Sequence, residues 1–543
     1  MHFKELETEQ KLRGAYYTPE WLADFVARWL AENNVLSVME PSCGDGVFIR
    51  ALASQTKDKK LEIFGMDINP DAVSQCCQTA FPQNVHASVV CDNYLSWALR
   101  ALQSEVLPQY DAVCGNPPFI RYQYLEKEQQ KQMQEIFSLL GLCFTKHTNI
   151  WIAFLILAVH FLRPGGLLAM VIPSEIIHVS YAAGARDYLE REAEWIHLLD
   201  PEDLWFENTS QGTVLLFLQK RFQRQAIGSS LLAITPTSGQ SFTQKSMSEI
   251  IEETNYLLTS HIAGKWTTAL LTSEERAAWN KVLASPEFAR FGELADITVG
   301  IVTGANDFFC VPDATVSEYG LEDVVMPAFR KSNHVPGVIF DANIHRQNKQ
   351  DGKGVNFLYF ESEKAAQTHK DYLDIGIQAG LPNRYKCRVR KPWYKVPSVW
   401  AAPLAMFNMA DKAPRLIYNA IGAITTDTAC RVTPKPDVDP KKLAYCFVNT
   451  VTALSAELEG RSYGGGVLEL IPSETARLVV PYFLDVQEQL LRLDVCITED
   501  GIMTAMQEQD DVLFRCCSVL TKGDVEVLRS AFMRLQARRR KKI

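Results

Sequence analysis

The chain has 543 residues, which is long for one domain, and this length predicts roughly two to four domains. With 47% hydrophobic and 22% charged residues, its composition is that of a globular protein and excludes a disordered or fibrous chain. The formal net charge of −9 excludes a surface that is basic throughout, so any nucleic-acid interface must be a local basic patch.

Cysteine spacing and hydropathy restrict the compartment and the kind of site. The 13 cysteines are scattered without any CxxC pair, which argues against a zinc site and against a secreted disulfide scaffold. The polar N-terminus is not a signal peptide, and the longest apolar run, residues 150–162, is too short to span a bilayer. We therefore expect a cytoplasmic protein with free thiols, no membrane segment and no bound metal.

The first predicted helix follows an aromatic segment. Thr18 is a natural N-cap with Pro19 at the first helical position, and apolar residues then recur at helical spacing up to Leu30. The preceding loop holds Tyr16 and Tyr17 and could touch a ligand.

Residues 35–50 predict a strand, a glycine-rich turn and a helix. In Rossmann-like folds, glycines at this position let a ligand approach the backbone. The turn is not G-x-G-x-x-G, and no Lys-Ser/Thr follows it, so a phosphate ligand and a dehydrogenase are disfavoured. Glu40 at the strand end would repel phosphate and attract an ammonium group.

Three further predicted strands also end in polar residues. Residues 61–66 lead to Asp67, an acid placed where Rossmann folds bind ribose hydroxyls, and residues 87–91 lead to Asp92 and Asn93. The fourth strand, residues 110–114, leads to Asn116. Each acid alone could be a helix cap, but four such residues in register favour a ligand site at the carboxyl edge of a sheet.

The segment Asn116-Pro117-Pro118-Phe119 is the stretch with the most specific chemistry. Two prolines fix φ and remove two backbone donors, so the turn is stiff and its carbonyls are unpaired. The Asn116 side-chain oxygen and a proline-turn carbonyl can together accept both hydrogens of one exocyclic amine, while Phe119 offers a face for a planar ring. A simple strand-end turn is the alternative.

In this order the motifs resemble those of the gamma-class (TaqI-like) S-adenosylmethionine-dependent N6-adenine DNA methyltransferases. The matching segments are residues 16–19, residues 40–46, Asp67, Asp92 and residues 116–119. They cover roughly the first 220 residues, with a target domain expected after the catalytic one. Residues 461–473 are a weaker match to a glycine-rich segment of related recognition domains.

The resemblance implies a set of residues that bind S-adenosylmethionine. Asp67 would bind its ribose, Asp92 its adenine, and Glu40 its amino-acid end. The full set is Tyr16, Thr18, Glu40, Ser42, Cys43, Gly44, Asp67, Ile68, Asp92, Asn93 and Asn116.

The resemblance also implies a catalytic set: Asn116, Pro117, Pro118, Phe119 and Phe206. The Asn116 side chain and the Pro117 carbonyl would accept hydrogen bonds from the N6 amine, and Phe119 would stack on a flipped adenine. By position Phe206 resembles the second aromatic residue, which packs on the other face of the base. Trp205 is the other candidate for this role. Alternatively, the aromatic side chain packs at a domain interface.

The predicted fold class is α/β, with a Rossmann-like methyltransferase domain of mostly parallel sheet and a C-terminal mixed α+β target-recognition domain. We expect the catalytic domain at residues 1–225, a linker or transition at 226–289 and the recognition domain at 290–480. Residues 481–543 are expected to be a helical segment with a basic tail, residues 538–542, that solvation alone could explain.

The densest positive patch, residues 384–395, predicts contact with DNA phosphates, although a solvated loop is the alternative. The glycine-rich turn at residues 298–306 could follow a DNA backbone, and residues 330–334 form a second small basic cluster. The predicted DNA-binding residues are Arg384, Lys386, Arg388, Arg390, Lys391, Trp393, Lys395, Arg461 and Tyr463.

The sequence therefore predicts site-specific methylation of N6 of a flipped adenine in double-stranded DNA. Methylation of structured RNA or of a protein glutamine amide by the same chemistry stays open, as does a non-catalytic DNA-binding specificity subunit. We see no nuclease motif, which fits an enzyme that acts alone or beside a cognate restriction endonuclease, and we expect a monomer.

Overall fold

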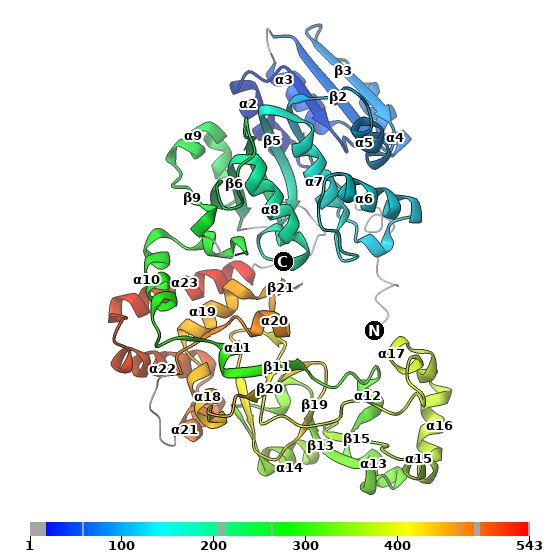
Figure 1. Cartoon of the computed structure of the whole chain (residues 1–543), viewed down its shortest axis with the longest axis vertical. Helices are drawn as coiled ribbons and strands as arrows, with labels where there is room; N and C mark the ends of the chain where they lie inside the picture. The colour runs from blue at the N-terminus through cyan, green and yellow to red at the C-terminus, as the bar shows by residue number, and fades with distance from the viewer. Residues whose placement is uncertain are drawn as a thin grey trace. The chain divides into compact units, whose positions relative to one another are not determined.

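The computed structural model describes residues 18–56, 59–202, 205, 212–261, 264–463, 466–482 and 489–540 (Figure 1). The chain divides into two compact units, the first ending at Leu270 and the second running over Leu271–Arg540. No helix among these residues has the length and apolar content needed to cross a membrane.

A nine-stranded sheet organises the first unit, in the order β3-β2-β1-β4-β5-β7-β6-β8-β9. Five of the neighbouring pairs are parallel, while β7 runs antiparallel to β5 and β6, and β9 to β8. The strands are β1 (Ser37–Glu40), β2 (Leu61–Asp67), β3 (Val85–Cys91), β4 (Tyr110–Gly115), β5 (Leu162–Pro173), β6 (Ala193–Pro201), β7 (Thr213–Lys220), β8 (Leu231–Thr237) and β9 (Leu257–Leu258). The predicted, mostly parallel α/β sheet is confirmed.

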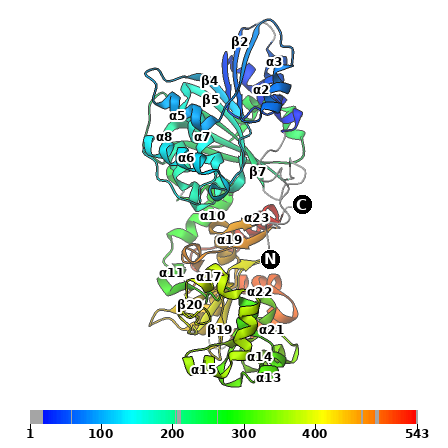
Figure 2. The ribbon, with the colours of Figure 1, turned by 90° about the vertical axis from the view of Figure 1, so that its right-hand side faces the viewer.

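Helices cover both faces of this sheet. They are α2 (Glu20–Glu32), α3 (Val47–Gln55), α4 (Pro70–Cys77), α5 (Tyr94–Leu102), α6 (Lys127–Leu139), α7 (Ile150–His160), α8 (Ala183–Glu192) and α9 (Met247–Glu253). In Figure 2, α2 and α3 lie on one side of the sheet and α5, α7 and α8 on the other.

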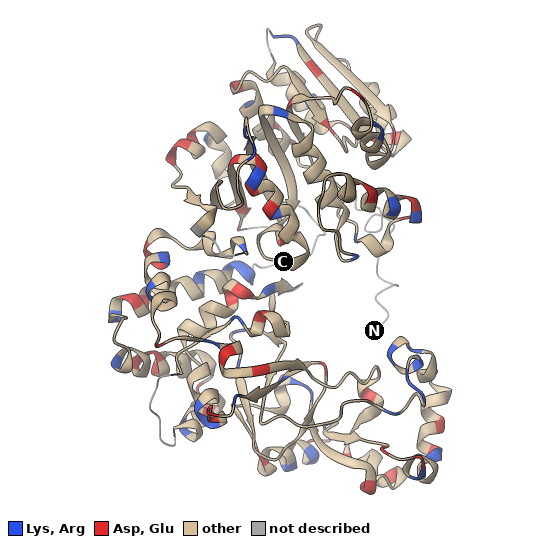
Figure 3. Cartoon of the chain, viewed as in Figure 1, with Lys and Arg blue, Asp and Glu red and all other residues tan. Residues whose placement is uncertain are grey.

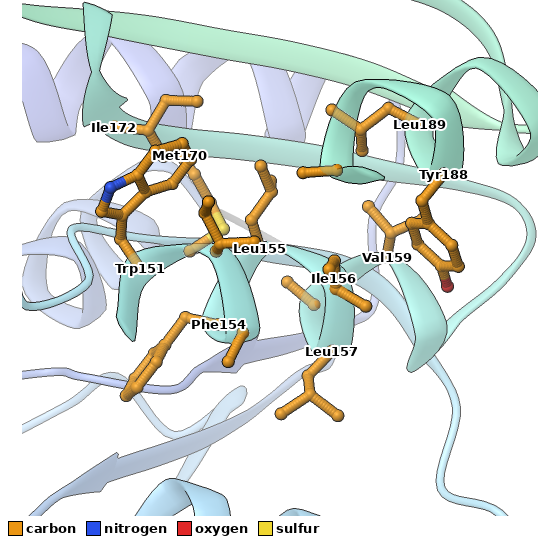
Figure 4. Close-up of a cluster of buried hydrophobic side chains, with 14 of the residues drawn as sticks. Trp151, Phe154, Leu155, Ile156, Leu157, Val159, Met170, Ile172, Tyr188 and Leu189 are labelled. Carbon is orange, nitrogen blue, oxygen red and sulfur yellow. The ribbon is translucent and has the colours of Figure 1, made fainter. Parts of the chain in front are cut away.

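Successive side chains of β5 point to opposite faces of the sheet and so contribute to the hydrophobic cores on both sides. Leu168, Met170 and Ile172 pack with α7 and α8, whereas Leu167, Ala169 and Val171 pack with α2 and α3. Helix α7 is buried from Ile150 to Val159 because it is apolar on all sides. Figure 4 shows its side chains packed against those of β5 and α8.

The range predicted as a linker, residues 226–289, contains sheet. Strand β8 pairs with β6 along its whole length, from Leu231 to Thr237, and β9 pairs with β8. The division between the two units falls within that range, after Leu270. Part of the polar composition that indicated a linker belongs to β8, which is next to the edge strand and needs apolar side chains on fewer positions.

The second unit combines small mixed sheets, ordered β11-β20-β16-β18-β14, β12-β15-β13-β19, β17-β22-β21 and β10-β23. Its strands are β10 (Ala289–Arg290), β11 (Ala295–Val299), β12 (Cys310–Val311), β13 (Val325–Phe329), β14 (Ile339–Phe340), β15 (Asn356–Leu358), β16 (Leu404–Phe407), β17 (Met409–Ala410), β18 (Leu416–Asn419), β19 (Ile424–Thr425), β20 (Ala429–Pro434), β21 (Arg461–Tyr463), β22 (Val467–Glu469) and β23 (Val479–Val480). This is the mixed α+β architecture predicted for the C-terminal half.

Its helices are α10 (Ser273–Ala284), α11 (Phe291–Leu294), α12 (Asn306–Phe309), α13 (Asp313–Tyr319), α14 (Ala342–Gln350), α15 (Glu363–Thr368), α16 (Lys370–Gln378), α17 (Tyr385–Arg388), α18 (Pro440–Phe447), α19 (Thr450–Glu459), α20 (Pro472–Thr475), α21 (Leu490–Glu499), α22 (Ile502–Cys516) and α23 (Lys522–Arg539).

Two arginines of the basic segment near the C-terminus are part of the fold, where a solvated tail was the alternative. Arg539 ends α23 with its side chain only 3% exposed and pairs with the equally buried Glu457 at 2.8 Å. Arg540 pairs with Asp411 at 3.2 Å. Lys541 and Lys542 lie outside the described residues.

Candidate active site

Polar side chains from four adjacent strands meet at one edge of the large sheet. Strands β3, β2, β1 and β4 are parallel neighbours, so their carboxyl ends share that edge. Glu40 ends β1 and Asp67 ends β2, while Asp92 and Asn116 directly follow β3 and β4. The predicted convergence of these residues is therefore present in the fold.

The glycine turn after β1 is clamped to the end of β2. Gly44 and Gly46 have φ angles of +53° and +87°, which glycine adopts most readily. A Cβ on Gly46 would lie 2.4 Å from the Cys76 sulfur. The Gly44 amide donates to one Asp67 carboxylate oxygen at 2.8 Å, and the Asn69 amide donates to the other at 2.8 Å. Backbone amides thus fix Asp67, yet its oxygens keep lone pairs for a ligand hydroxyl.

Glu40 is a buried acid beneath this turn. It is 1% exposed, and its Oε2 atom has no hydrogen-bond partner among the described residues. Burial, followed by the neighbouring Cys76, Asp67 and Asp45, raises the pKa of Glu40 well above its usual value. An unsatisfied buried carboxyl is a site that a cationic group would complete, which fits the ammonium group of S-adenosylmethionine.

Asn116 connects three segments that are distant in sequence. Its side-chain nitrogen donates to the Thr18 hydroxyl at 3.3 Å, and the Ser42 hydroxyl donates to its backbone carbonyl at 3.1 Å. Thr18 was predicted as the cap of α2, but that helix has Pro19 at its N-cap and no side-chain cap. The Thr18 hydroxyl accepts from Asn116 instead.

The proline turn itself is held at both sides. Pro117 is buried, while Pro118 and Phe119 are half-buried, with Phe119 packed at the margin of the core around α7. The Ile150 amide donates to the Ile120 carbonyl at 3.0 Å and ties the turn to the start of α7. Phe119 is therefore a half-buried residue next to a backbone hydrogen bond that holds the turn.

Asp92 and Asn93 are both engaged locally. Asp92 accepts from the Asn93 amide at 2.7 Å and forms an ion pair with Arg100 of α5. The Asn93 side chain caps α5 by accepting from the Leu95 and Ser96 amides. Arg100 was not predicted; a cation two helical turns beyond the acid was its only signal in the sequence.

The remaining predicted cofactor residues differ in accessibility. Ile68 is 62% exposed next to Asp67, so its apolar surface is open to a ligand. Cys43 is 3% exposed, with its thiol against that of Cys76. Tyr16 lies outside the described residues.

Of the two residues predicted to supply a second stacking ring, the structure describes one. Phe206 lies outside the described residues. Trp205 packs edge-on against Trp21 at 5.9 Å and meets Phe242 at 5.8 Å, ring centroid to ring centroid. These contacts give Trp205 a packing role in the core around α2.

Lys and Arg gather in the second unit at α17 and the segment that follows it (Figure 3). Some of these side chains are exposed and others are anchored to the fold. The exposed cations are Arg384, Lys386, Arg388, Lys391 and Lys395. Arg390 is half-buried and donates to the carbonyls of Val302 and, at 2.8 Å, Thr303. Trp393 packs on Phe308, with 5.5 Å between ring centroids.

The glycine-rich segment around β21 offers little free charge. Arg461 pairs with Glu474 at 2.8 Å, and the Glu474 side chain is 2% exposed. Tyr463 lies in β21, but its side chain lies outside the described residues.

Most of the chain matches known DNA methyltransferases. Residues 3–287 match the N-6 DNA Methylase family, and residues 263–514 match the C-terminal domain of Type II methyltransferase M.Eco57I. Type II methyltransferase M.AccI of Acinetobacter calcoaceticus is 21% identical over 483 residues, which cover 87% of this chain and 86% of that protein. M.BanIII of Aneurinibacillus aneurinilyticus is 20% identical over 495 residues, which cover 80% and 83%.

Among solved structures, the type IIG restriction endonuclease BpuSI aligns with a TM-score of 0.43 and 13% identity, over 97% of this chain and 66% of that one. The family match spans more than half of the chain, and the polar residues of its motifs meet at the sheet edge described above. The chain belongs to the N-6 DNA methylase family and is an enzyme that uses S-adenosylmethionine to methylate adenine in DNA at N6.

Proposed function

We propose that Asn116 and Pro117 hold the N6 amine of an adenine extruded from duplex DNA, at a specific sequence that the second unit recognises. The observation that carries this proposal is the pair of hydrogen bonds that join Asn116 to Thr18 and Ser42. Through them, the amine acceptor and the glycine turn belong to one rigid assembly. Positioning of this kind supplies most of the catalysis when no covalent intermediate is needed.

The chain's residues suit the cofactor. Glu40 would accept the ammonium group, Asp67 a ribose hydroxyl and Asp92 an adenine amine, while the open side chain of Ile68 would pack on a ring. Tyr16, Thr18, Ser42, Cys43, Gly44 and Asn93 complete the proposed set. When bound, S-adenosylmethionine supplies a methyl group on a positively charged sulfur.

The target adenine must leave the duplex, which costs a few kcal/mol. Stacking on Phe119 would offset roughly 1–3 kcal/mol of this cost, and Phe206 is proposed to cover the other face of the base. The Asn116 amide oxygen and the Pro117 carbonyl accept the two amine hydrogens and so direct the nitrogen lone pair. The amine becomes acidic only as the new bond forms, so no strong general base is required.

The exposed cations at residues 384–395 support duplex DNA as the substrate, because they match a polyanion. We further propose that the enzyme acts as a cytoplasmic monomer beside a cognate restriction endonuclease.

Single-molecule sequencing of DNA from a methylation-free bacterial host that expresses the chain tests this function. We expect N6-methyladenine within one short motif. N6-methyladenine confined to no single motif, from an enzyme that still binds S-adenosylmethionine when purified, would contradict the proposed recognition of a specific sequence.

A further inference from the structure

Helix α17 and the residue that caps its C-terminal end present two large hydrophobic side chains to solvent. Tyr385 is 66% exposed and Val389 is 64% exposed. They are four residues apart, and Val389 continues the right-handed helical backbone as the C-cap, so the two side chains lie on one face. Single exposed apolar residues are common on protein surfaces, so their surroundings decide whether this pair has a function.

The helix is fixed to the glycine-rich turn before α12. Cys387 is fully buried, and its thiol donates to the Thr303 carbonyl at 3.7 Å. Arg390 donates to the same carbonyl at 2.8 Å, and Arg384 donates to the Gly304 carbonyl at 3.4 Å. Gly304 has a φ of +76°, and a Cβ there would lie 2.8 Å from Cβ of Lys386. The exposed pair is therefore mounted on a rigid support.

All the charged residues that flank the pair in the sequence are basic. Residues 384–395 contain six Lys or Arg and no Asp or Glu, in a chain whose net charge is −9. The Lys386 ammonium lies 5.6 Å from the centre of the Tyr385 ring. Such a field selects a polyanion, but contacts with phosphates position a protein without reading the sequence.

We propose that Tyr385 and Val389 determine sequence specificity by contacting thymine methyl groups in the major groove, while the exposed cations around them hold the phosphates. This inference rests on the proposed function. The 5-methyl group of thymine is the apolar feature of the major groove, and apolar side chains recognise it. A rigid apolar pair within a cationic rim suits that contact.

The test uses the full-length enzyme and duplex oligonucleotides that carry the sequence methylated in cells. Each thymine outside the target base pair is replaced by uracil, which lacks only the methyl group. For the wild type, we expect kcat/KM to fall about fivefold at one position or more. In Tyr385→Ala or Val389→Ala, kcat/KM on the thymine-containing duplex should be lower than in the wild type. Replacing the thymine at that position by uracil should then lower kcat/KM no further.

Two variants provide controls. Ile377→Ala removes an exposed apolar side chain of α16, 52% exposed, and should keep the uracil penalty. Lys386→Gln combined with Arg388→Gln should weaken binding to all sequences and lower the salt slope by about two, while the uracil penalty stays. Equal thermal unfolding midpoints would confirm that the variants fold.

The outcomes distinguish a failure of the proposed function from a failure of the inference about thymine contacts. A wild type that methylates no DNA overturns the proposed function together with this inference. A wild type that methylates DNA but is insensitive to uracil at every position overturns the inference alone. Variants that retain the full uracil penalty do the same.

Discussion

The carboxamide of Asn116 has a fixed orientation because its nitrogen donates to Thr18. The oxygen is then at the opposite end of the group, and it is the atom proposed to accept from the adenine amine. We predict that Asn116→Ala lowers methyl transfer at least about 100-fold, as loss of one preorganised hydrogen-bonding group does in other enzymes.

The readouts for Asn116→Ala are radiolabelled methyl transfer and calorimetric binding of S-adenosylmethionine, and binding should change little. Asn84→Ala is the matched control, because the Asn84 side chain donates to the carbonyls of Thr56 and Lys59, away from the site. Normal turnover by the Asn116 variant would refute its assignment as the amine acceptor.

Glu40 links the site to pH. Because burial raises its pKa in the folded protein, the folded state holds a proton that the unfolded state has released above the ordinary Glu value. The ligand-free enzyme should therefore lose stability from Glu40 as pH rises above that value. We predict that Glu40→Gln flattens this dependence and weakens cofactor binding at least about tenfold.

Unfolding midpoints of the wild type and Glu40→Gln between pH 5 and pH 8, with and without S-adenosylmethionine, check this prediction. An identical pH dependence in the two proteins would exclude the proposed proton.

At the level of elements, the turn between β1 and α3 combines a left-handed backbone with a close contact. Gly46→Ala should cost about 1–2 kcal/mol of backbone strain and about 1–3 kcal/mol more from the clash with Cys76. Gly239→Ala is the matched control, since its φ is +55° and nothing lies within 4 Å of the added Cβ. Free energies of unfolding from urea titrations measure both, and equal losses would show that no clash exists.

Helix α23 is anchored by a buried ion pair, and Arg539 also donates to the Asp411 carbonyl at 2.9 Å. Arg539→Ala would leave Glu457 buried without its partner, so we predict a loss of about 3–5 kcal/mol in unfolding free energy. Arg540→Ala breaks only the exposed pair with Asp411 and should cost at most about 1 kcal/mol. Similar losses for both variants in chemical denaturation would show that burial of the pair contributes nothing.

For the whole molecule, the two compact units separate the proposed tasks. The described residues proposed to hold the cofactor all precede Pro117 in the first unit, which has its own cores on both sides of the sheet. We predict that a fragment of residues 1–270 binds S-adenosylmethionine with nearly the affinity of the full chain but methylates no specific sequence. Calorimetry and sequencing of DNA from expressing cells test the two halves of this prediction. A folded fragment without affinity for the cofactor would contradict it.

The sequence by itself determined the α/β fold and the four polar residues at one sheet edge. Strand periodicity, glycine turns and the Asn-Pro-Pro-Phe segment are local patterns, and parallel neighbours bring their ends together without further information. It also indicated the mixed architecture of the C-terminal half, from short apolar runs broken by Gly, Pro and Asn.

Only the tertiary structure decided which polar and aromatic side chains face solvent and which are committed to the fold. Arg388 is exposed while Arg390 holds a turn, and Arg539 is buried against Glu457 although the adjacent Arg540 is not. Strands β8 and β9 likewise became visible only through the pairing of β8 with β6 and of β9 with β8. The physical reason is that a side chain's partner is set by contacts between segments far apart in sequence, which residue type and spacing do not encode.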